Sequence, residues 1–172
     1  MNLLTRIFGG QDAAQAYRPL YEAVVAEARR PHWFAEGRVP DTFDGRFDML
    51  SSVLALVLLR LEEEGESGRR PSARLTELFI ADMDGQLRER GIGDLVVGKH
   101  IGRMMGQLGG RLAAYREGLR PGGDLAGALD RNLWRGADVP AEARAHAEAA
   151  FRALAAGLSG RDAEAVLAGE IA

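Results

Sequence analysis

The sequence contains no cysteine and only three histidines, His32, His100 and His146. The missing cysteines exclude disulfide scaffolds, cysteine-based zinc sites, iron–sulfur ligation and thiol nucleophiles. The three histidines are too widely separated to form a recognisable metal-binding motif. We therefore expect no metal and no cofactor.

An excess of basic residues is also missing. The 22 Lys+Arg and 25 Asp+Glu residues give a net charge of -3, which argues against direct binding of nucleic acid. Lys99 is the only lysine, and every other basic residue is arginine. A GC-rich coding bias explains this composition; the alternative is that position 99 needs a compact ammonium group.

The sequence has no apolar run long enough for a bilayer span. The most apolar run, residues 49–61, is shorter than the about 20 residues that a span needs, so it predicts a buried core helix in a cytoplasmic protein. Residues 1–10 are too short for a signal peptide and form a short amphipathic segment. This segment either docks on its own domain or touches the inner face of the cytoplasmic membrane.

The apolar spacing predicts an all-α fold. The length indicates one domain over residues 11–172. We expect a single bundle of about six to seven helices, which the spacing places at 17–28, 44–64, 72–90, 94–115, 124–133, 140–158 and 161–167.

Turn and cap residues define the expected boundaries of these helices. Pro31 should end the first helix, and residues 31–45 and 65–71 are expected to be a loop and a polar linker. Gly91 should stop the third helix. The expected N-caps are Asp44, Ser72, Asp94 and Asp124.

A row of glycines interrupts the predicted helix over 94–115. It consists of Gly98, Gly102, Gly106 and Gly110, with Gly109 beside the last. Each interior glycine costs a helix about 0.8–1 kcal/mol relative to alanine. We expect close packing against another helix of the same chain to offset this cost; the alternative is a shallow groove that receives a partner helix.

Acidic residues are placed against apolar faces. Asp82 lies near the centre of the apolar stripe of its helix, and Asp48 opens the most apolar helix. A buried carboxylate needs a partner, and Arg46, Arg88 and Arg111 are available. The pattern indicates an internal Asp–Arg network, with a polar patch on a binding face as the alternative.

No catalytic motif accompanies these features. Asp82 and Asp84 form a DxD sequence, but their side chains point apart on a helix. The sequence contains no glycine-rich phosphate loop after a strand and no nucleophile–base group with recognisable spacing. We therefore expect no catalytic residue.

Several blocks resemble one known family. Val39-Pro40-Asp41-Thr42 followed by Gly45-Arg46-Phe47-Asp48-Met49-Leu50 resembles the first signature of the ubiquinol–cytochrome c chaperone family. Asp82-Met83-Asp84 and Gly91-Ile92-Gly93-Asp94-Leu95-Val96-Val97-Gly98-Lys99 resemble later ones, as do Gly110-Arg111 and Asn132-Leu133. The resemblance covers about residues 15–135.

The resemblance implies a non-enzymatic assembly chaperone. Members of the family help newly made cytochrome b enter the ubiquinol–cytochrome c reductase complex, and mitochondrial ones act with a small partner protein near the ribosome. The lack of a transit peptide indicates a bacterial member. The alternatives are a generic helical adaptor or dimer with another client, and an all-α ligand-binding protein.

A chaperone for an apolar client needs an adaptable apolar surface with a charged rim. The candidate client-binding residues are therefore the aromatic, methionine and charged residues Trp33, Phe34, Arg46, Phe47, Asp82, Met83, Arg88, Asp94, Lys99, Met104 and Met105. Core packing, helix capping and surface ion pairs are the alternative roles of these residues.

Overall fold

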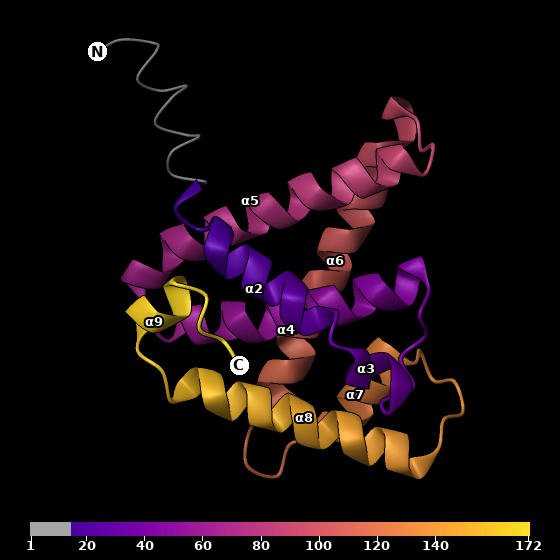
Figure 1. The fold of residues 1–172 in the computed structure, drawn as a ribbon, viewed down its shortest axis with the longest axis vertical. Helices are drawn as coiled ribbons and strands as arrows, with labels where there is room; N and C mark the ends of the chain where they lie inside the picture. Colours follow the sequence, from indigo (N-terminus) through magenta and orange to yellow (C-terminus); the bar gives the residue numbers. More distant parts are fainter. Residues whose placement is uncertain (1–14) are drawn as a thin grey trace.

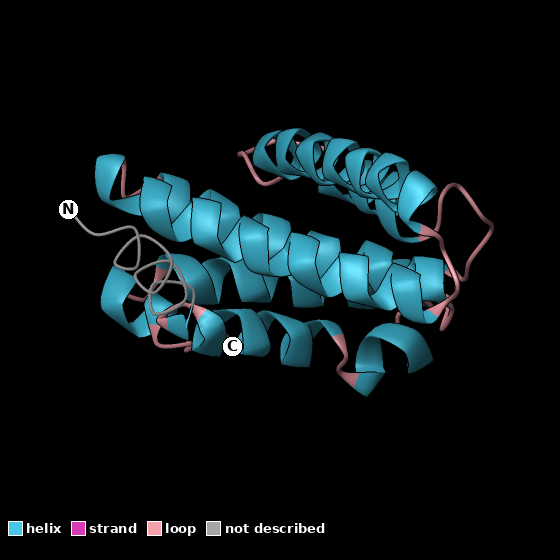
Figure 2. Cartoon of the chain, turned by 90° about the horizontal axis from the view of Figure 1, so that it is seen from above, coloured by secondary structure: helices cyan, strands magenta, loops and turns pink. Residues whose placement is uncertain are grey.

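The structure is a computed structural model, and it describes residues 15–172. These residues form eight α-helices and no strand (Figures 1 and 2), which confirms the predicted all-α bundle. The amphipathic segment predicted at residues 1–10 lies outside the described residues. The helices are α2 (Arg18–Ala28), α3 (Pro31–Ala35), α4 (Phe43–Glu62), α5 (Glu66–Glu89), α6 (Asp94–Gly118), α7 (Leu125–Leu133), α8 (Ala141–Ser159) and α9 (Ala163–Leu167).

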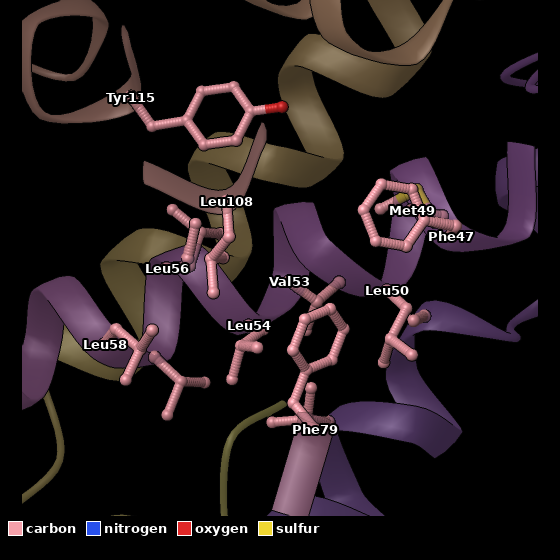
Figure 3. Close-up of a cluster of buried hydrophobic side chains, with 14 of the residues drawn as sticks. Phe47, Met49, Leu50, Val53, Leu54, Leu56, Leu58, Phe79, Leu108 and Tyr115 are labelled. Carbon is pink, nitrogen blue, oxygen red and sulfur yellow. The ribbon is translucent and has the colours of Figure 1, made fainter. Parts of the chain in front are cut away.

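Helix α4 forms the centre of the bundle. It is buried without interruption from Phe47 to Leu58, and α2, α5, α6, α7 and α8 all pack against it (Figure 3). A helix that is apolar on all sides is expected to be buried on all sides, so the prediction for residues 49–61 is confirmed. None of the helices in residues 15–172 is long and apolar enough to cross a membrane.

Several predicted helix ends are confirmed. Helix α5 ends just before Gly91, whose φ of 82° favours glycine. Asp124 caps α7, because its side chain accepts a hydrogen bond of 2.8 Å from the backbone N–H of Gly127. Helix α8 begins directly after Pro140.

The segment predicted as a loop over residues 31–45 is in part helical. Pro31 ends α2 as expected, but it also occupies the first turn of α3, where its fixed φ and missing N–H are tolerated. The indole N–H of Trp33 donates to the backbone carbonyl of Glu27 at 3.0 Å, which ties α3 to the end of α2.

The polar linker predicted at residues 65–71 is wrong, because α5 already begins at Glu66. Pro71 lies inside the helix, early enough to remove one bond near its start, and its ring is buried. Ser72 is consequently not an N-cap; its hydroxyl donates to the carbonyl of Gly68 at 2.8 Å.

Two other N-cap predictions are also wrong. Thr42, not Asp44, caps α4: its hydroxyl accepts the N–H of Gly45 at 3.1 Å. Gly93 stands at the N-cap of α6, and the side chain of Asp94 makes no capping bond. The Asp94 carboxylate pairs with Arg88 instead, across the turn between α5 and α6.

Candidate functional site

Three adjoining hollows surround the N-terminal end of α4, and we call them together the α4 groove. The first, of about 550 Å³, lies beside Phe34 and shares Arg46 with the second, of about 220 Å³. The second is lined by Phe47 and Met83, and it shares Phe47 with the third, of about 350 Å³, which extends to Met104. The groove therefore runs from α3, past α2 and α5, to α6.

The floor of the α4 groove is apolar. Phe43 and Phe47 are four residues apart on α4, and Met83 and Leu87 are four residues apart on α5, so each pair shares one helix face. Phe47 and Met83 belong to the hydrophobic core and are only 4% and 2% exposed, so the apolar surface that the groove offers comes from the half-buried Phe34 and Phe43. The floor is therefore the outer edge of the core, held firmly in place by the packing behind it.

The rim of the groove is rich in arginine. Five arginines line it against two aspartates, Asp41 and Asp44: Arg29, Arg46, Arg90, Arg103 and Arg135. This local excess contrasts with the net charge of -3 for the whole chain. The positive end of the α4 macrodipole points into the same region.

Two of the rim arginines have carboxylate partners. Arg46 donates to Asp41 at 2.6 Å, and this hydrogen bond lowers the pKa of the Asp41 carboxyl. Arg135 donates to Asp48 at 2.8 Å and lies 3.5 Å from Asp44; the hydrogen bond to Asp48 raises the pKa of the Arg135 guanidinium. These pairs orient two arginines at the mouth of the groove.

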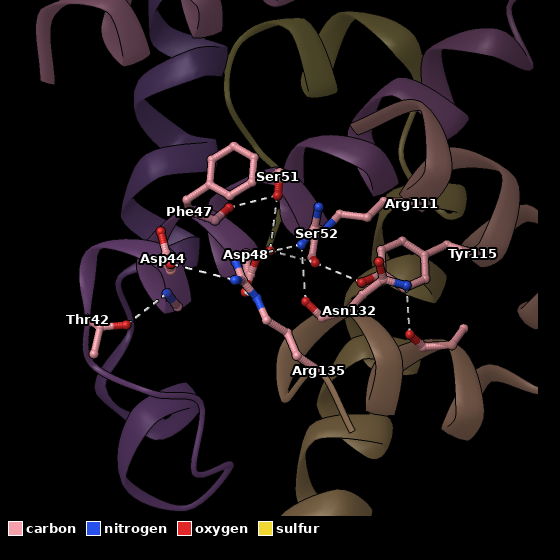
Figure 4. Close-up of polar contacts among 12 residues, drawn as sticks. Thr42, Asp44, Phe47, Asp48, Ser51, Ser52, Arg111, Tyr115, Asn132 and Arg135 are labelled. Atoms are coloured by element: carbon pink, nitrogen blue, oxygen red, sulfur yellow. Dashed lines mark hydrogen bonds and ion pairs between the residues drawn. The ribbon is translucent and has the colours of Figure 1, made fainter. Parts of the chain in front are cut away.

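A buried ionic network lies directly behind the groove (Figure 4). The Asp48 carboxylate accepts hydrogen bonds from Arg111 at 2.5 Å and from Arg135 at 2.8 Å. Arg111 also donates to the backbone carbonyl of Asn132 at 3.1 Å. The predicted internal Asp–Arg network is therefore present for Asp48 and Arg111, and the structure adds Arg135 to it.

Asp82 does not belong to this network. It is half-buried, and its carboxylate accepts a hydrogen bond of 2.7 Å from the hydroxyl of Tyr21 and one of 2.9 Å from Gln86. Burial and the bond to Asp82 raise the pKa of the Tyr21 hydroxyl. Among the described residues Asp82 has no arginine partner, so the expected Asp–Arg pairing is wrong at this position.

The structure brings five of the eleven candidate residues together. Phe34, Arg46, Phe47, Met83 and Met104 all line the α4 groove, although they come from α3, α4, α5 and α6. The grouping follows from the bundle, because the start of α4 faces α2 and α5 in one hollow and α5 and α6 in the next.

The remaining candidates lie elsewhere. Arg88 and Asp94 fasten the turn between α5 and α6, and Trp33 is fully buried. Lys99 is exposed on α6 and forms no ion pair with any residue of 15–172. Met105 is half-buried and packs against the core.

The glycine row of α6 faces outward. A Cβ added at Gly98, Gly102, Gly106, Gly109 or Gly110 would meet no side chain and no other helix within 4 Å. The expected helix crossing is therefore wrong within residues 15–172, and the row forms a strip without side chains on the surface of α6. Near its start, Leu95 is fully exposed.

Sequence analysis missed most of the arginine rim. Arg29 and Arg90 are the C-cap residues of α2 and α5, and a basic residue there is the usual complement to the helix dipole. Arg135 has a φ of 54° and precedes Gly136. The Arg135-Gly136 sequence after the last apolar residues of α7 was the one sequence signal that could have indicated a turn with an arginine at this position.

The described residues thus form an all-α bundle with an arginine-rimmed groove at the start of its central helix. The sequence matches the model of the family described as Ubiquinol-cytochrome C chaperone over residues 35–172, so the chain belongs to this family. Its structure is similar to the crystal structure of the Cbp3 homolog from Brucella abortus, with a TM-score of 0.80 and 30% sequence identity, over 99% of this chain and 96% of that chain. No curated protein matches the sequence.

Proposed function

We propose that this protein is a non-enzymatic assembly chaperone that binds newly made cytochrome b and assists assembly of the ubiquinol–cytochrome c reductase complex. The observation that supports this most is family membership over residues 35–172. The α4 groove supplies a surface suited to the task. An unassembled membrane subunit exposes apolar segments, and an exposed apolar surface with a polar rim is typical of a site that binds such a segment.

The client contacts are assigned first to the α4 groove. Phe34 supplies partly exposed aromatic surface, and Phe47, Met83 and Met104 line the groove from the core beneath it. Arg46 supplies charge at the rim. Trp33 and Asp82 support the groove from behind, through the bonds that hold α3 to α2 and α2 to α5.

A second contact area is assigned to the outer side of α5 and α6. Arg88 and Asp94 fix the turn there, beside the fully exposed Leu95. Lys99 lies one turn after Leu95 and continues this area along α6, and the half-buried Met105 is a further candidate contact on the same helix. In this area exposed apolar surface lies beside charged side chains. We propose that the protein acts in the cytoplasm, at the inner face of the membrane that receives the client. A small partner protein or the ribosome is a further proposed partner.

The test is deletion of the gene, followed by measurement of cytochrome b and of the assembled reductase complex. We expect both to fall, and to recover when the wild-type gene is returned. A returned Arg46→Glu gene should restore less than a returned Arg69→Glu gene. Arg69 is the matched charge reversal, because it is exposed, also pairs with a carboxylate, and lies in the first turn of α5, whereas the groove lies at the other end of that helix. Unchanged levels after deletion would contradict the proposal and favour an adaptor with another client.

Co-purification tests the proposed client and the contact area on α6. Cytochrome b should co-purify with the wild-type protein, and less of it with Lys99→Glu. A folded Lys99→Glu protein that retains the full amount of cytochrome b would remove the α6 surface from the contact area.

A further inference from the structure

We propose that the α4 groove selects a partner segment that is both apolar and acidic: an amphipathic stretch of polypeptide whose carboxylates bind the arginine rim. This inference deepens the proposed function, on which it rests only for the name of the client. The single observation behind it is that the apolar floor is surrounded by arginines, three of which have no carboxylate partner within the described chain.

The unpaired arginines are Arg29, Arg90 and Arg103. All three are exposed, line the groove, and form no ion pair with any carboxylate of residues 15–172. Arg46 and Arg135 already hold Asp41 and Asp48. The excess charge is therefore concentrated on the three arginines that remain free to bind a partner.

Arg90 shows how a carboxylate is received. Its guanidinium lies over the ring of Phe43, 4.5 Å from the ring centroid. Stacking occupies the flat face of the guanidinium and leaves the N–H groups at its edge free, in the fork that matches a carboxylate. The groove thus binds an apolar side chain of the partner next to an acidic side chain of the partner that pairs with Arg90.

The shape of the site favours a peptide over a membrane surface. The arginines surround hollows of about 550, 220 and 350 Å³ that lie between the ends of α2, α4 and α5 and the side of α6. A flat layer of lipid headgroups reaches protruding side chains, whereas the hollows between the arginines, beside the half-buried Phe34 and Phe43, are filled by a narrow chain that enters the groove. A row of three hollows also suits an extended segment better than one side chain.

The experiment uses the full chain and three labelled peptides, with binding measured by fluorescence anisotropy. The first is an amphipathic helix of Leu and Phe with Glu on its polar face, the second has Gln in place of every Glu, and the third is this chain's own residues 1–14. We expect the Glu peptide to bind at least about tenfold more tightly than the Gln peptide, one such step being about 1.4 kcal/mol, and to weaken with salt. Equal binding of the two would overturn the proposal.

Variants identify the surface. Arg90→Gln with Arg103→Gln should remove most of the preference for the Glu peptide, while Arg69→Gln with Arg70→Gln, the same change on exposed residues of the first turns of α5, should leave it intact. Thermal melts confirm that both pairs fold. If the Arg90→Gln, Arg103→Gln protein still prefers the Glu peptide over the Gln peptide as wild type does, the proposal is contradicted.

Two further arms separate other occupants. If residues 1–14 bind more tightly than the Glu peptide, the groove belongs to the chain's own N-terminal segment and the proposal is wrong. If vesicles of phosphatidylglycerol bind the protein and the Glu peptide does not, the rim recognises lipid and the proposal is likewise wrong. If the Glu peptide shows no preference but deletion of the gene lowers cytochrome b, the acidic specificity is wrong and the proposed function stands. If the Glu peptide is preferred but deletion leaves cytochrome b unchanged, the acidic specificity stands and the proposed function is wrong.

Discussion

Asp48 of α4 and Arg111 of α6 form an ion pair of 2.5 Å that is closed off from solvent, with the two residues 1% and 3% exposed. The pair joins the central helix to its neighbour directly behind the α4 groove. Arg111 also lies over the ring of Phe47, 5.4 Å from the ring centroid. The same ion pair thus fixes the packing of α4 on α6 and the position of one aromatic side chain on the groove floor.

Removal of the charge on Asp48 should therefore be costly. In Asp48→Asn the buried Arg111 loses its carboxylate, and breaking a buried pair in this way costs about 3–5 kcal/mol. We expect a loss of this size in the free energy of unfolding measured with urea. Asp44→Asn is the matched control, since Asp44 is exposed and lies 3.5 Å from Arg135; its effect should stay below about 1 kcal/mol. Equal effects at the two positions would contradict the structural role of the buried pair.

Tyr115 adds a second polar link between α6 and α4 beside this ion pair. Its hydroxyl lies 2.7 Å from the hydroxyl of Ser52, whose own proton is donated to the carbonyl of Asp48 at 2.7 Å. Tyr115 is therefore the donor in its bond to Ser52. Burial raises the pKa of Tyr115 to about 12, so the phenol should remain protonated when exposed tyrosines ionise near pH 10.

Tyr115→Phe should cost about 1 kcal/mol, because one buried hydrogen bond is lost while the ring packing against Phe151 is kept. The measurement is urea unfolding at pH 7. An ultraviolet titration should also compare the folded wild-type protein with the same protein unfolded in urea. Each buried phenol should be missing from the tyrosines that ionise near pH 10 in the folded protein, and should appear among them in urea. A Tyr115→Phe protein that is as stable as wild type would show that the bond to Ser52 contributes nothing.

The helical fold could be predicted because its signals are local. Apolar spacing identified each long helix, and Asp124 and Gly91 marked ends through capping and turn preferences that act over a few residues. The predicted helix boundaries were wrong where these local preferences compete with burial or with other residues that can start a helix. Pro71 looked like the end of a linker, yet its burial early in α5 outweighs one lost hydrogen bond. Ser72 and Asp44 have the right type for a cap, but α4 is capped by Thr42, two residues before Asp44, and α5 begins at Glu66, a full turn and more before Ser72.

The candidate site was predictable only in part, since it depends on contacts between distant residues. Phe47 and Met83 were identified by their type, but nothing local shows that α4 and α5 place them at one groove. Arg29 and Arg90 look like ordinary residues at helix ends. The outward direction of Gly106 was also not predictable, because it depends on which face of α6 the core covers.

His32 should make the stability of the protein depend on pH. Nδ1 of His32 lies 3.0 Å from Nε2 of His146, which links α3 to α8. Burial, Arg30 and His146 lower the pKa of His32, while Glu27 and Glu36 raise it less. A lowered pKa means that the unfolded chain takes up a proton at His32 before the folded protein does. Stability from this group is therefore complete above about pH 6.5 and is lost as the pH falls below it.

The measurement is the free energy of unfolding between pH 7.5 and 5.5, a range above the titration of ordinary carboxyls. We expect wild type to lose stability toward pH 5.5 and His32→Gln to lose less. His100→Gln is the control, because His100 lies on α6 and outside the His32–His146 pair. An equal slope in wild type and His32→Gln would show that the pKa of His32 does not change on folding.

The outward glycines of α6 should be stabilised by alanine. A methyl group at Gly102 or Gly106 would meet no side chain and no other helix within 4 Å, so the gain in helix propensity of about 0.8–1 kcal/mol should be realised at each position. Gly45 and Gly68 are the matched controls. A Cβ at Gly45 would lie 1.9 Å from the carbonyl oxygen of Pro40, and one at Gly68 would lie 1.8 Å from that of Leu61. Alanine should destabilise the protein at both controls, although the helix propensity of the substitution is the same. If Gly106→Ala instead lowers the melting temperature, another surface covers this glycine strip of α6 in solution.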